Sequence, residues 1–284
     1  MGAIVARGHR YYGAPEREQA IEGLAGRFRP FSNEVTFQRL PVPHPNGSGS
    51  VTLVNIRGKQ HAEQQRRLIV ATHWDTRLWA EEDPDPSRRE LPIPGANDGT
   101  SGIAVMLELA RALHQAPLRH FGVDYVLFDG EEFGRPGTND YCQGSRYLAG
   151  HLTDWYPNEL PEAAIVMDMV GDKDLGILEE QYSRERASWL YETVLSAAAD
   201  RGERAFSGQR RMAIVDDHVA LLESGIPAIL LIDYDYPYWH THGDTMEQCS
   251  PDSLARVGNV LLDTLRRLDD AAVSGTLRSP SPTP

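Results

Sequence analysis

The sequence is poor in cysteine, in basic charge and in long apolar runs, and each shortage excludes a class of protein. Two cysteines, Cys142 and Cys249, lie far apart and outside any CxxC pattern, which excludes a disulfide scaffold and a thiolate zinc site. The formal net charge of −13 argues against a nucleic acid partner, because a phosphate binder needs a basic face. No apolar run approaches the roughly 20 residues of a membrane span.

Length and composition predict one large folded domain. The chain has 284 residues, of which 40% are hydrophobic and 24% charged, so a sizeable core is expected. We expect a single domain over residues 1–272 and a disordered tail over residues 273–284, which end in alternating Ser and Pro. Residues 1–7 contain too short an apolar run for a signal peptide. We expect a cytoplasmic location if the chain begins here, and a periplasmic or secreted one if it has been trimmed.

Apolar patterning predicts alternating strands and helices. Alternating or continuous apolar runs predict strands at 35–40, 51–56, 68–71, 123–127, 164–167 and 228–232. Apolar residues at helical spacing predict helices at 15–28, 103–113, 184–201 and 253–268. Between these elements, residues 78–94 are acidic and rich in proline, and we interpret them as a long surface loop over the site.

The most informative stretch is Phe128-Asp129-Gly130-Glu131-Glu132, which follows a predicted buried strand. In open α/β sheets, ligands bind at the carboxyl ends of the strands. The side chains of adjacent residues point in different directions, so one carboxylate can bind a cation while the other moves protons. A Glu-Glu pair alone is usually a solvated acidic turn, so the rest of the chain must supply further ligands.

Other predicted strand ends supply such residues. They are His73 and Asp75, Asp168, and His240 beyond the last strand, joined by Asp98 from a glycine-rich loop. Carboxylates and imidazoles are ligands that suit Zn²⁺. So many acids in one crevice would repel one another, and a cation would remove that repulsion. The sequence therefore predicts a metal centre at this edge of the sheet.

At this point the chain resembles a known family over roughly residues 8–268: the zinc-dependent exopeptidase superfamily, which contains aminopeptidases with two zinc ions and animal-type glutaminyl cyclases. The motifs are His73-x-Asp75, Gly95-Ala96-Asn97-Asp98, Asp129-Gly130-Glu131-Glu132, Gly144-Ser145-Arg146, Asp168-Met169-Val170-Gly171, Asp217-His218 and His240-Thr241. The resemblance implies that Asp98, Glu132 and His240 bind zinc and that Glu131 is the general acid/base. It also implies that His73 and Asp168 match the ligands of a second zinc in the aminopeptidases, with Asp75 as an orienting partner of His73.

Two branches of this superfamily compete. In an aminopeptidase, Glu131 would activate water for attack on a peptide bond. In a cyclase, the amino terminus of the substrate attacks its own γ-carboxamide, and Glu131 carries the proton to the departing ammonia. Asp216 favours the cyclase, because cyclases carry Asp before the Asp-His pair, where it forms an acidic network with the residues that match Glu131 and Asp168.

Aromatic residues also resemble those of the cyclases. We expect Trp239, Tyr236 and Trp79 to form the substrate pocket, the last as in bacterial cyclase-like members. Two features depart from the animal cyclases: Val215 replaces a residue that can be polar, and the Trp-bearing insertion after Glu132 is missing. We interpret His242 as a surface residue and His218 as a group that caps or orients a helix start.

We therefore predict an α/β fold, a three-layer α/β/α sandwich around a mixed, mostly parallel twisted sheet. The predicted function is zinc-dependent glutaminyl-peptide cyclotransferase, acting on the amino termini of peptides or proteins with one zinc per chain. The alternative is a zinc aminopeptidase of the same family, which would hold one or two zinc ions. A non-catalytic binding domain is a third class, and Glu131 argues against it because a pure binder needs no base beside the metal.

Overall fold

The computed structural model describes residues 1–45, 47, 49–206 and 211–274. Its strands are β1 (Glu34–Pro43), β2 (Ser50–Gln60), β3 (Arg67–His73), β4 (Gly122–Phe128), β5 (Ala163–Asp168), β6 (Glu179–Glu180), β7 (Arg211–Met212) and β8 (Ala228–Ile232). Its α-helices are α1 (Gly2–Val5), α2 (Arg17–Phe28), α3 (Ser101–Gln115), α4 (Gln143–Gly150), α5 (Gln181–Arg186), α6 (Ser188–Asp200), α7 (Asp217–Glu223) and α8 (Pro251–Ser274). Short 3₁₀ turns lie at 29–31, 86–88, 152–154, 204–206 and 246–248.

Six of the strands form the central sheet, in the order β1-β2-β4-β3-β5-β8. The four strands β4, β3, β5 and β8 are parallel neighbours, whereas β1 and β2 form an antiparallel hairpin that joins through β2 to β4. The predicted mixed, mostly parallel sheet is therefore confirmed. The inner strands are continuous apolar runs because both faces of the sheet are covered, as is usual for parallel strands.

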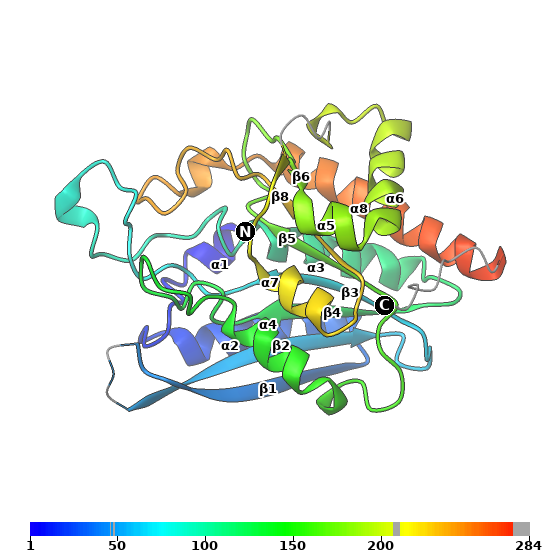
Figure 1. The fold of residues 1–284 in the computed structure, drawn as a ribbon, viewed down its shortest axis with the longest axis horizontal. Coiled ribbons are helices and arrows are strands. Elements are labelled where there is room, and N and C mark those ends of the chain that lie inside the picture. Colours follow the sequence, from blue (N-terminus) through cyan, green and yellow to red (C-terminus); the bar gives the residue numbers. More distant parts are fainter. Residues whose placement is uncertain (46, 48, 207–210, 275–284) are drawn as a thin grey trace.

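Helices cover both faces of this sheet (Figure 1). On one face α4 and α7 pack against each other, α4 over β2 and α7 over β5 and β8. On the other face α3 lies over β3, β4 and β5 and contacts α2 and α8. The main apolar core lies in these two interfaces, with Trp74, Phe121 and Tyr125 at most 1% exposed. This is the predicted three-layer arrangement.

One predicted helix was wrong. Residues 184–201 were predicted as one helix, but the chain leaves helical geometry at Ala187 (φ −137°, ψ 40°), which ends α5 and precedes α6. The last helix, α8, extends to Ser274, and the domain over residues 1–272 stays a prediction. The rest of the predicted disordered tail, from residue 275 onward, lies outside the described residues.

No helix among the described residues is long and apolar enough to cross a membrane.

Candidate metal centre and active site

The acidic and imidazole side chains meet because of where each strand ends. His73 and Asp168 are the last residues of the parallel strands β3 and β5, which are adjacent in the sheet. Glu131 and Glu132 follow β4 on the other side of β3, and Asp98 lies just before α3. Parallel strands end at the same edge of a sheet, so the topology brings these groups together.

Two glycines let the backbone turn sharply at this edge. Gly130 has φ +70° between Asp129 and the two glutamates, and a Cβ there would collide with the side chain of Leu53. Gly99 has φ +81°, and a Cβ there would collide with the carbonyl oxygen of Asp75 and approach the ring of His73. Residues that carry a Cβ rarely adopt either conformation, so the local geometry requires glycine at both positions.

The first ligand group consists of Asp98, Glu132 and His240. One candidate ligand atom from each residue lies within 4.8 Å of the others, and all three residues are buried. His240 Nε2 lies 3.3 Å from Glu132 Oε1 and 3.8 Å from Asp98 Oδ2. These are the three residues that the resemblance implied as zinc ligands, and the fold places them together.

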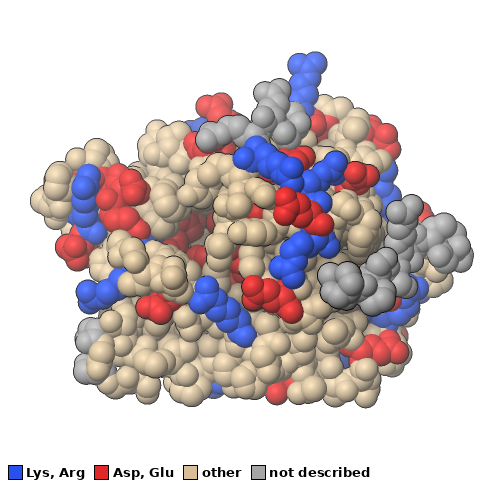
Figure 2. Space-filling model, viewed as in Figure 1, with Lys and Arg blue, Asp and Glu red and all other residues tan. Residues whose placement is uncertain are grey.

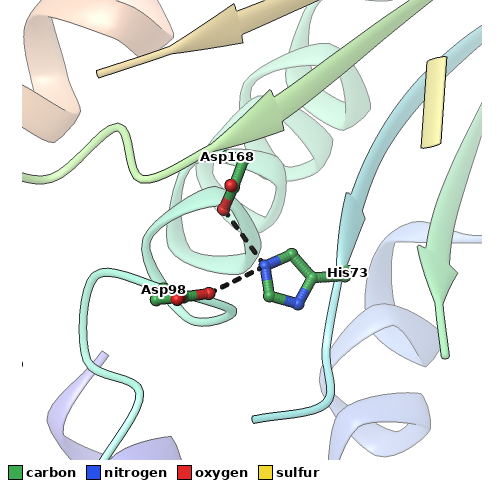
Figure 3. A group of neighbouring side chains, drawn as sticks. All are labelled: His73, Asp98 and Asp168. Carbon is green, nitrogen blue, oxygen red and sulfur yellow. Dashed lines mark hydrogen bonds and ion pairs between the residues drawn. The ribbon is translucent and has the colours of Figure 1, made fainter. Parts of the chain in front are cut away.

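The second group consists of His73, Asp98 and Asp168, and it shares Asp98 with the first. Figure 3 shows one nitrogen of His73 directed at both carboxylates, with Nε2 at 3.2 Å from Asp98 Oδ1 and 3.1 Å from Asp168 Oδ1. Burial alone would lower the pKa of His73, but hydrogen bonds with the carboxylates, first Asp168, raise it well above its usual value. The carboxylates of this group therefore favour positive charge at this position.

The first group fits a zinc ion by its donor chemistry. Two carboxylates and one imidazole form a common zinc ligand set that leaves a position open for a reacting group. Within the described part of the chain, the buried atoms Asp98 Oδ2 and Glu132 Oε2 accept no hydrogen bond. Burial alone would lower the pKa of His240, but the surrounding acids, first Glu132, raise it to about 10. The group thus attracts positive charge, which a metal ion would supply.

Glu131 lies beside the ligands and has a different environment. Burial, followed by the charges of Glu132 and Asp216, raises its pKa well above the usual value. Its Oε1 accepts a hydrogen bond from the Cys142 thiol at 3.2 Å. A carboxyl group with a raised pKa is suited to accept and return protons near neutral pH. Burial and the neighbouring Asp168 likewise raise the pKa of Asp216 to about 6.

These groups face a cavity of about 310 Å³. Figure 2 shows acidic side chains recessed in a hollow left of the centre of the molecule. The cavity wall includes Glu131, Asp168, Asp216, Trp239 and the exposed side chain of Val215. A hollow of about 360 Å³ between α3 and α8 is slightly larger, but no member of either ligand group lines it. The ligand chemistry therefore marks the acidic cavity as the candidate active site.

Two of the three predicted pocket aromatics lie elsewhere. Trp79 packs against Tyr12 and Phe133 in a separate apolar cluster and is not among the residues that line the cavity. Tyr236 is buried and donates its hydroxyl hydrogen to Asp244 at 2.8 Å. Trp239 does line the cavity, and its ring stacks on the ring of His240. Of the three, only Trp239 lines the cavity.

Asp75 lies behind both ligand groups. Its Oδ1 is 3.6 Å from His73 Nδ1, and its Oδ2 accepts a hydrogen bond from the Glu132 amide at 3.1 Å. It is not a member of either ligand group. The role of Asp75 as an orienting partner of His73 stays a prediction.

Two histidines have partners that the sequence did not predict. His242, interpreted as a surface residue, has a side chain only 13% exposed, and its backbone amide and Nδ1 both contact Asp83 Oδ2 at 2.9 Å. His218 is fully buried with Nε2 at 3.0 Å from Glu180 Oε2, so it ties the start of α7 to the start of α5.

Asp244 is a supporting residue whose importance the sequence did not reveal. It is fully buried and accepts hydrogen bonds from the amides of Asn97 and Asp98, at 2.8 and 3.2 Å. It therefore fixes the backbone that carries the ligand Asp98, from a segment almost 150 positions away. Its location four residues after His240 was the only available signal.

Comparison with known proteins identifies the family. Residues 52–265 match peptidase family M28. A glutaminyl-peptide cyclotransferase from Boiga irregularis is 26% identical over 89% of this chain and 75% of its own length. The structure of Porphyromonas gingivalis glutaminyl cyclase is similar with a TM-score of 0.88 and 30% identity, covering 94% of this chain and 95% of the other. A zinc-dependent exopeptidase from Parabacteroides distasonis has a TM-score of 0.88 and 31% identity, with coverages of 93% and 94%.

The family match spans most of the chain and includes every residue of both ligand groups. The predicted resemblance to the zinc exopeptidase superfamily is therefore confirmed. The chain is an enzyme of peptidase family M28, a family of zinc-dependent exopeptidases to which glutaminyl cyclases are similar.

Proposed function

We propose that this enzyme is a glutaminyl-peptide cyclotransferase, which converts the amino-terminal glutamine of peptides to pyroglutamate and releases ammonia. The observation that carries the proposal is the position of Asp216. This residue caps α7 and lines the same cavity as Glu131 and Asp168, as expected of the acidic network of a cyclase. The similarity to glutaminyl cyclases over most of the chain supports the same assignment.

The reaction needs one carbonyl to be polarised and one proton to be moved. A zinc ion held by Asp98, Glu132 and His240 would polarise the γ-carboxamide carbonyl of the substrate. Glu131 takes a proton from the α-amine as its nitrogen bonds to the carboxamide carbon. The same carboxyl returns that proton to the leaving nitrogen as the carbon–nitrogen bond of the amide breaks, so ammonia departs and the ring closes.

The cavity favours this intramolecular reaction. Asp168 and Asp216 lie beside Glu131 and can hold the α-amine of the substrate by charge-assisted hydrogen bonds. Trp239 supplies an apolar wall against which the short glutaminyl side chain can fold back toward its own amine. Holding the amine and the carboxamide together removes much of the entropic cost of ring closure.

A zinc aminopeptidase is the second candidate, and the second ligand group favours it. His73 and Asp168 could share a further ion with Asp98, as expected of an aminopeptidase with two zinc ions. In that reaction, Glu131 would remove a proton from water for attack on the first peptide bond.

One assay separates the two candidates. Purified protein is incubated with Gln-containing peptides and, separately, with aminoacyl chromogenic substrates, before and after chelation of the metal. We expect ammonia and pyroglutamyl peptide from the first substrates, no chromogen from the second, and loss of turnover on chelation. Release of chromogen without cyclisation would establish the aminopeptidase instead, and inertness toward both would support a binding protein.

A further inference from the structure

The loop after β3 contacts the candidate ligand His240 at its side chain and its backbone. Glu81 Oε1 lies 2.9 Å from His240 Nδ1, on the side of the ring opposite the ligand group. The amide of the next residue, Glu82, donates a hydrogen bond to the His240 carbonyl oxygen at 3.3 Å. Asp83, the next residue of the loop, accepts a hydrogen bond from the amide of His242, two residues after His240. The segment 81–83 therefore runs along and supports the segment 240–242.

His240 needs such support because its backbone is strained. Its φ is +52°, a left-handed conformation that residues other than glycine rarely adopt. A conformation of this kind persists only when surrounding contacts hold it, and it is common at functional sites. The contacts from Glu81 and Glu82 are placed to do so.

Arg77 connects this support to a second ligand. It is fully buried, and its Nη2 donates a hydrogen bond to Glu81 Oε1 at 2.6 Å. Its Nη1 donates to the carbonyl oxygen of Glu132 at 3.1 Å and lies 3.3 Å from the carboxylate of the same residue. A buried guanidinium is tolerated only when it is paired, and here its charged partners are Glu81 and Glu132. It also donates hydrogen bonds to the Gly134 carbonyl oxygen and the Tyr141 hydroxyl. One side chain therefore links Glu132 directly, and His240 through Glu81.

This geometry determines which nitrogen of His240 can face a metal. A carboxylate can only accept a hydrogen bond, so Nδ1 must carry the hydrogen that contacts Glu81. The lone pair is then on Nε2, the nitrogen that faces Asp98 and Glu132. Partners of this kind fix the tautomer and orientation of a metal-binding histidine.

We propose that Arg77 and Glu81 are positioning residues for the metal centre, with Glu81 orienting His240 and Arg77 holding Glu81 against Glu132. The inference rests on Asp98, Glu132 and His240 being the zinc ligands, and it holds whether the reaction is cyclisation or peptide hydrolysis. Neither residue touches the reacting atoms. Their effect is on how tightly and in which orientation the ligands are held.

Glu81 borders the cavity, and its side chain is 21% exposed, so a different role has to be separated by experiment. As a carboxylate on the cavity wall, it would also be able to bind the ammonium group of a substrate. Loss of an ammonium-binding group would raise KM and leave zinc affinity unchanged. Loss of an orienting group would weaken zinc binding in the absence of any substrate.

The test is a zinc titration against a competing chromophoric chelator, with metal-free protein and no substrate. We expect Glu81→Ala to weaken zinc binding by about 10- to 100-fold, the usual effect of removing an orienting partner. Glu81→Gln should lose less, because its amide oxygen still accepts a hydrogen bond from Nδ1. Glu82→Gln is the matched control, since it makes the same change at the adjacent exposed carboxylate. The control should bind zinc as the wild type does.

Two outcomes would overturn the proposal. Wild-type zinc affinity in Glu81→Ala, with only KM raised, would assign Glu81 to substrate binding. An equal loss in Glu82→Gln would show a general electrostatic effect of the acidic loop. Thermal unfolding of the metal-free variants identifies any variant that fails to fold. If Glu81→Ala fails to fold, the zinc affinity of Glu81→Gln, which keeps the shape of the side chain, tests the proposal instead.

Failure of the ligand assignment gives a different result. If His240→Ala retains wild-type zinc affinity in the same titration, the ligand set itself is wrong and Glu81 has nothing to orient. Absence of cyclase activity, by contrast, would leave the zinc titrations unaffected.

The variant Arg77→Lys extends the test, because lysine keeps the charge but cannot reach Glu81 and Glu132 together. It should weaken zinc binding, as Glu81→Ala does.

Discussion

The two ligand groups share Asp98 but differ in what surrounds their histidines. His240 turns one nitrogen to Glu81 and the other to its fellow ligands. His73 places Nε2 between Asp98 and Asp168, and its Nδ1 lies 3.6 Å from Asp75 Oδ1, beyond hydrogen-bond distance. Neighbouring acids raise the pKa of both histidines, so the two groups differ in how the histidine ring is held and not in the charge they favour. Histidines at the same edge of the sheet thus differ in the contacts that orient their rings.

The carboxylates Glu132 and Asp98 differ in the charge that they favour. Burial would raise the pKa of Glu132, but His240 and Arg77 outweigh it and hold that pKa well below its usual value. Glu132 is therefore an anion ready to bind a metal. Burial and the nearby acids, first Glu132, raise the pKa of Asp98 well above its usual value. Asp98 is the residue that the two ligand groups share.

The largest effect should follow removal of a ligand from the His240 group. Glu132→Ala or His240→Ala leaves only two protein ligands, which hold a catalytic zinc poorly. We expect both variants to lose zinc and turnover together, as measured by metal analysis and by the cyclisation assay. Full zinc occupancy in both would show that the ion is held elsewhere, and the contrast between the two groups would then be wrong.

The next largest effect should come from Glu131, which adjoins both groups but belongs to neither. Glu131→Gln keeps the size of the side chain and removes the proton acceptor. We expect zinc to stay bound while the rate falls by about 10²- to 10⁴-fold, the usual contribution of a general base. Activity within a few-fold of the wild type would exclude this role.

Asp216 tests the acidic surroundings of the His73 group. Asp216→Ala removes a neighbour of both Glu131 and Asp168, and we expect cyclisation to slow by about 10- to 100-fold, as for other partners of catalytic groups. The pH–rate profile should change shape, because coupled acids titrate together. A variant that cyclises normally with an unchanged profile would remove the main reason to prefer the cyclase.

The same residue predicts a pH dependence of stability. The pKa of Asp216 is about 6 in the folded chain and about 3.9 for an unperturbed aspartate, so folding favours the protonated form. Its stabilising contribution is complete below the unfolded pKa and is lost as pH rises through about 6. Asp216→Asn cannot ionise, so its Tm relative to metal-free wild type should increase between pH 5 and pH 8. An unchanged difference would mean that Asp216 is not proton-linked to folding.

Much of the fold could be predicted because its signals are local. The inner strands are largely apolar on both faces, so the continuous apolar runs were sufficient to predict them. The helix break at Ala187 could not be predicted, because no glycine or proline lies near it in the sequence. The helix that ends there, α5, packs against the distant strand β8, where Ser183 Oγ accepts a hydrogen bond from the amide of Leu230.

Some residues of the candidate site could likewise be predicted from local sequence signals, whereas others depend on distant contacts. Ligand-type residues at strand ends are visible in the sequence, since each follows a recognisable strand. The roles of Glu81 and Asp244 depend on how two loops fold back on each other, about 160 positions apart for Glu81 and His240. Trp79 was misplaced for the same reason, because an aromatic residue in an acidic loop does not show which side of the loop it covers.

The last and smallest expected effect concerns the number of zinc ions. We expect one zinc per chain, because Asp216 lies beside Asp168 and can share a proton with it, which makes Asp168 a poorer metal ligand. Ring closure also needs only one polarised carbonyl. His73→Gln should therefore leave the zinc content at one, whereas His240→Ala abolishes it. Metal stoichiometry on protein purified without added zinc, with anomalous scattering from crystals, measures both. Two ions bridged by Asp98 in the wild type, with one lost in His73→Gln, would make the two groups equivalent and favour the aminopeptidase.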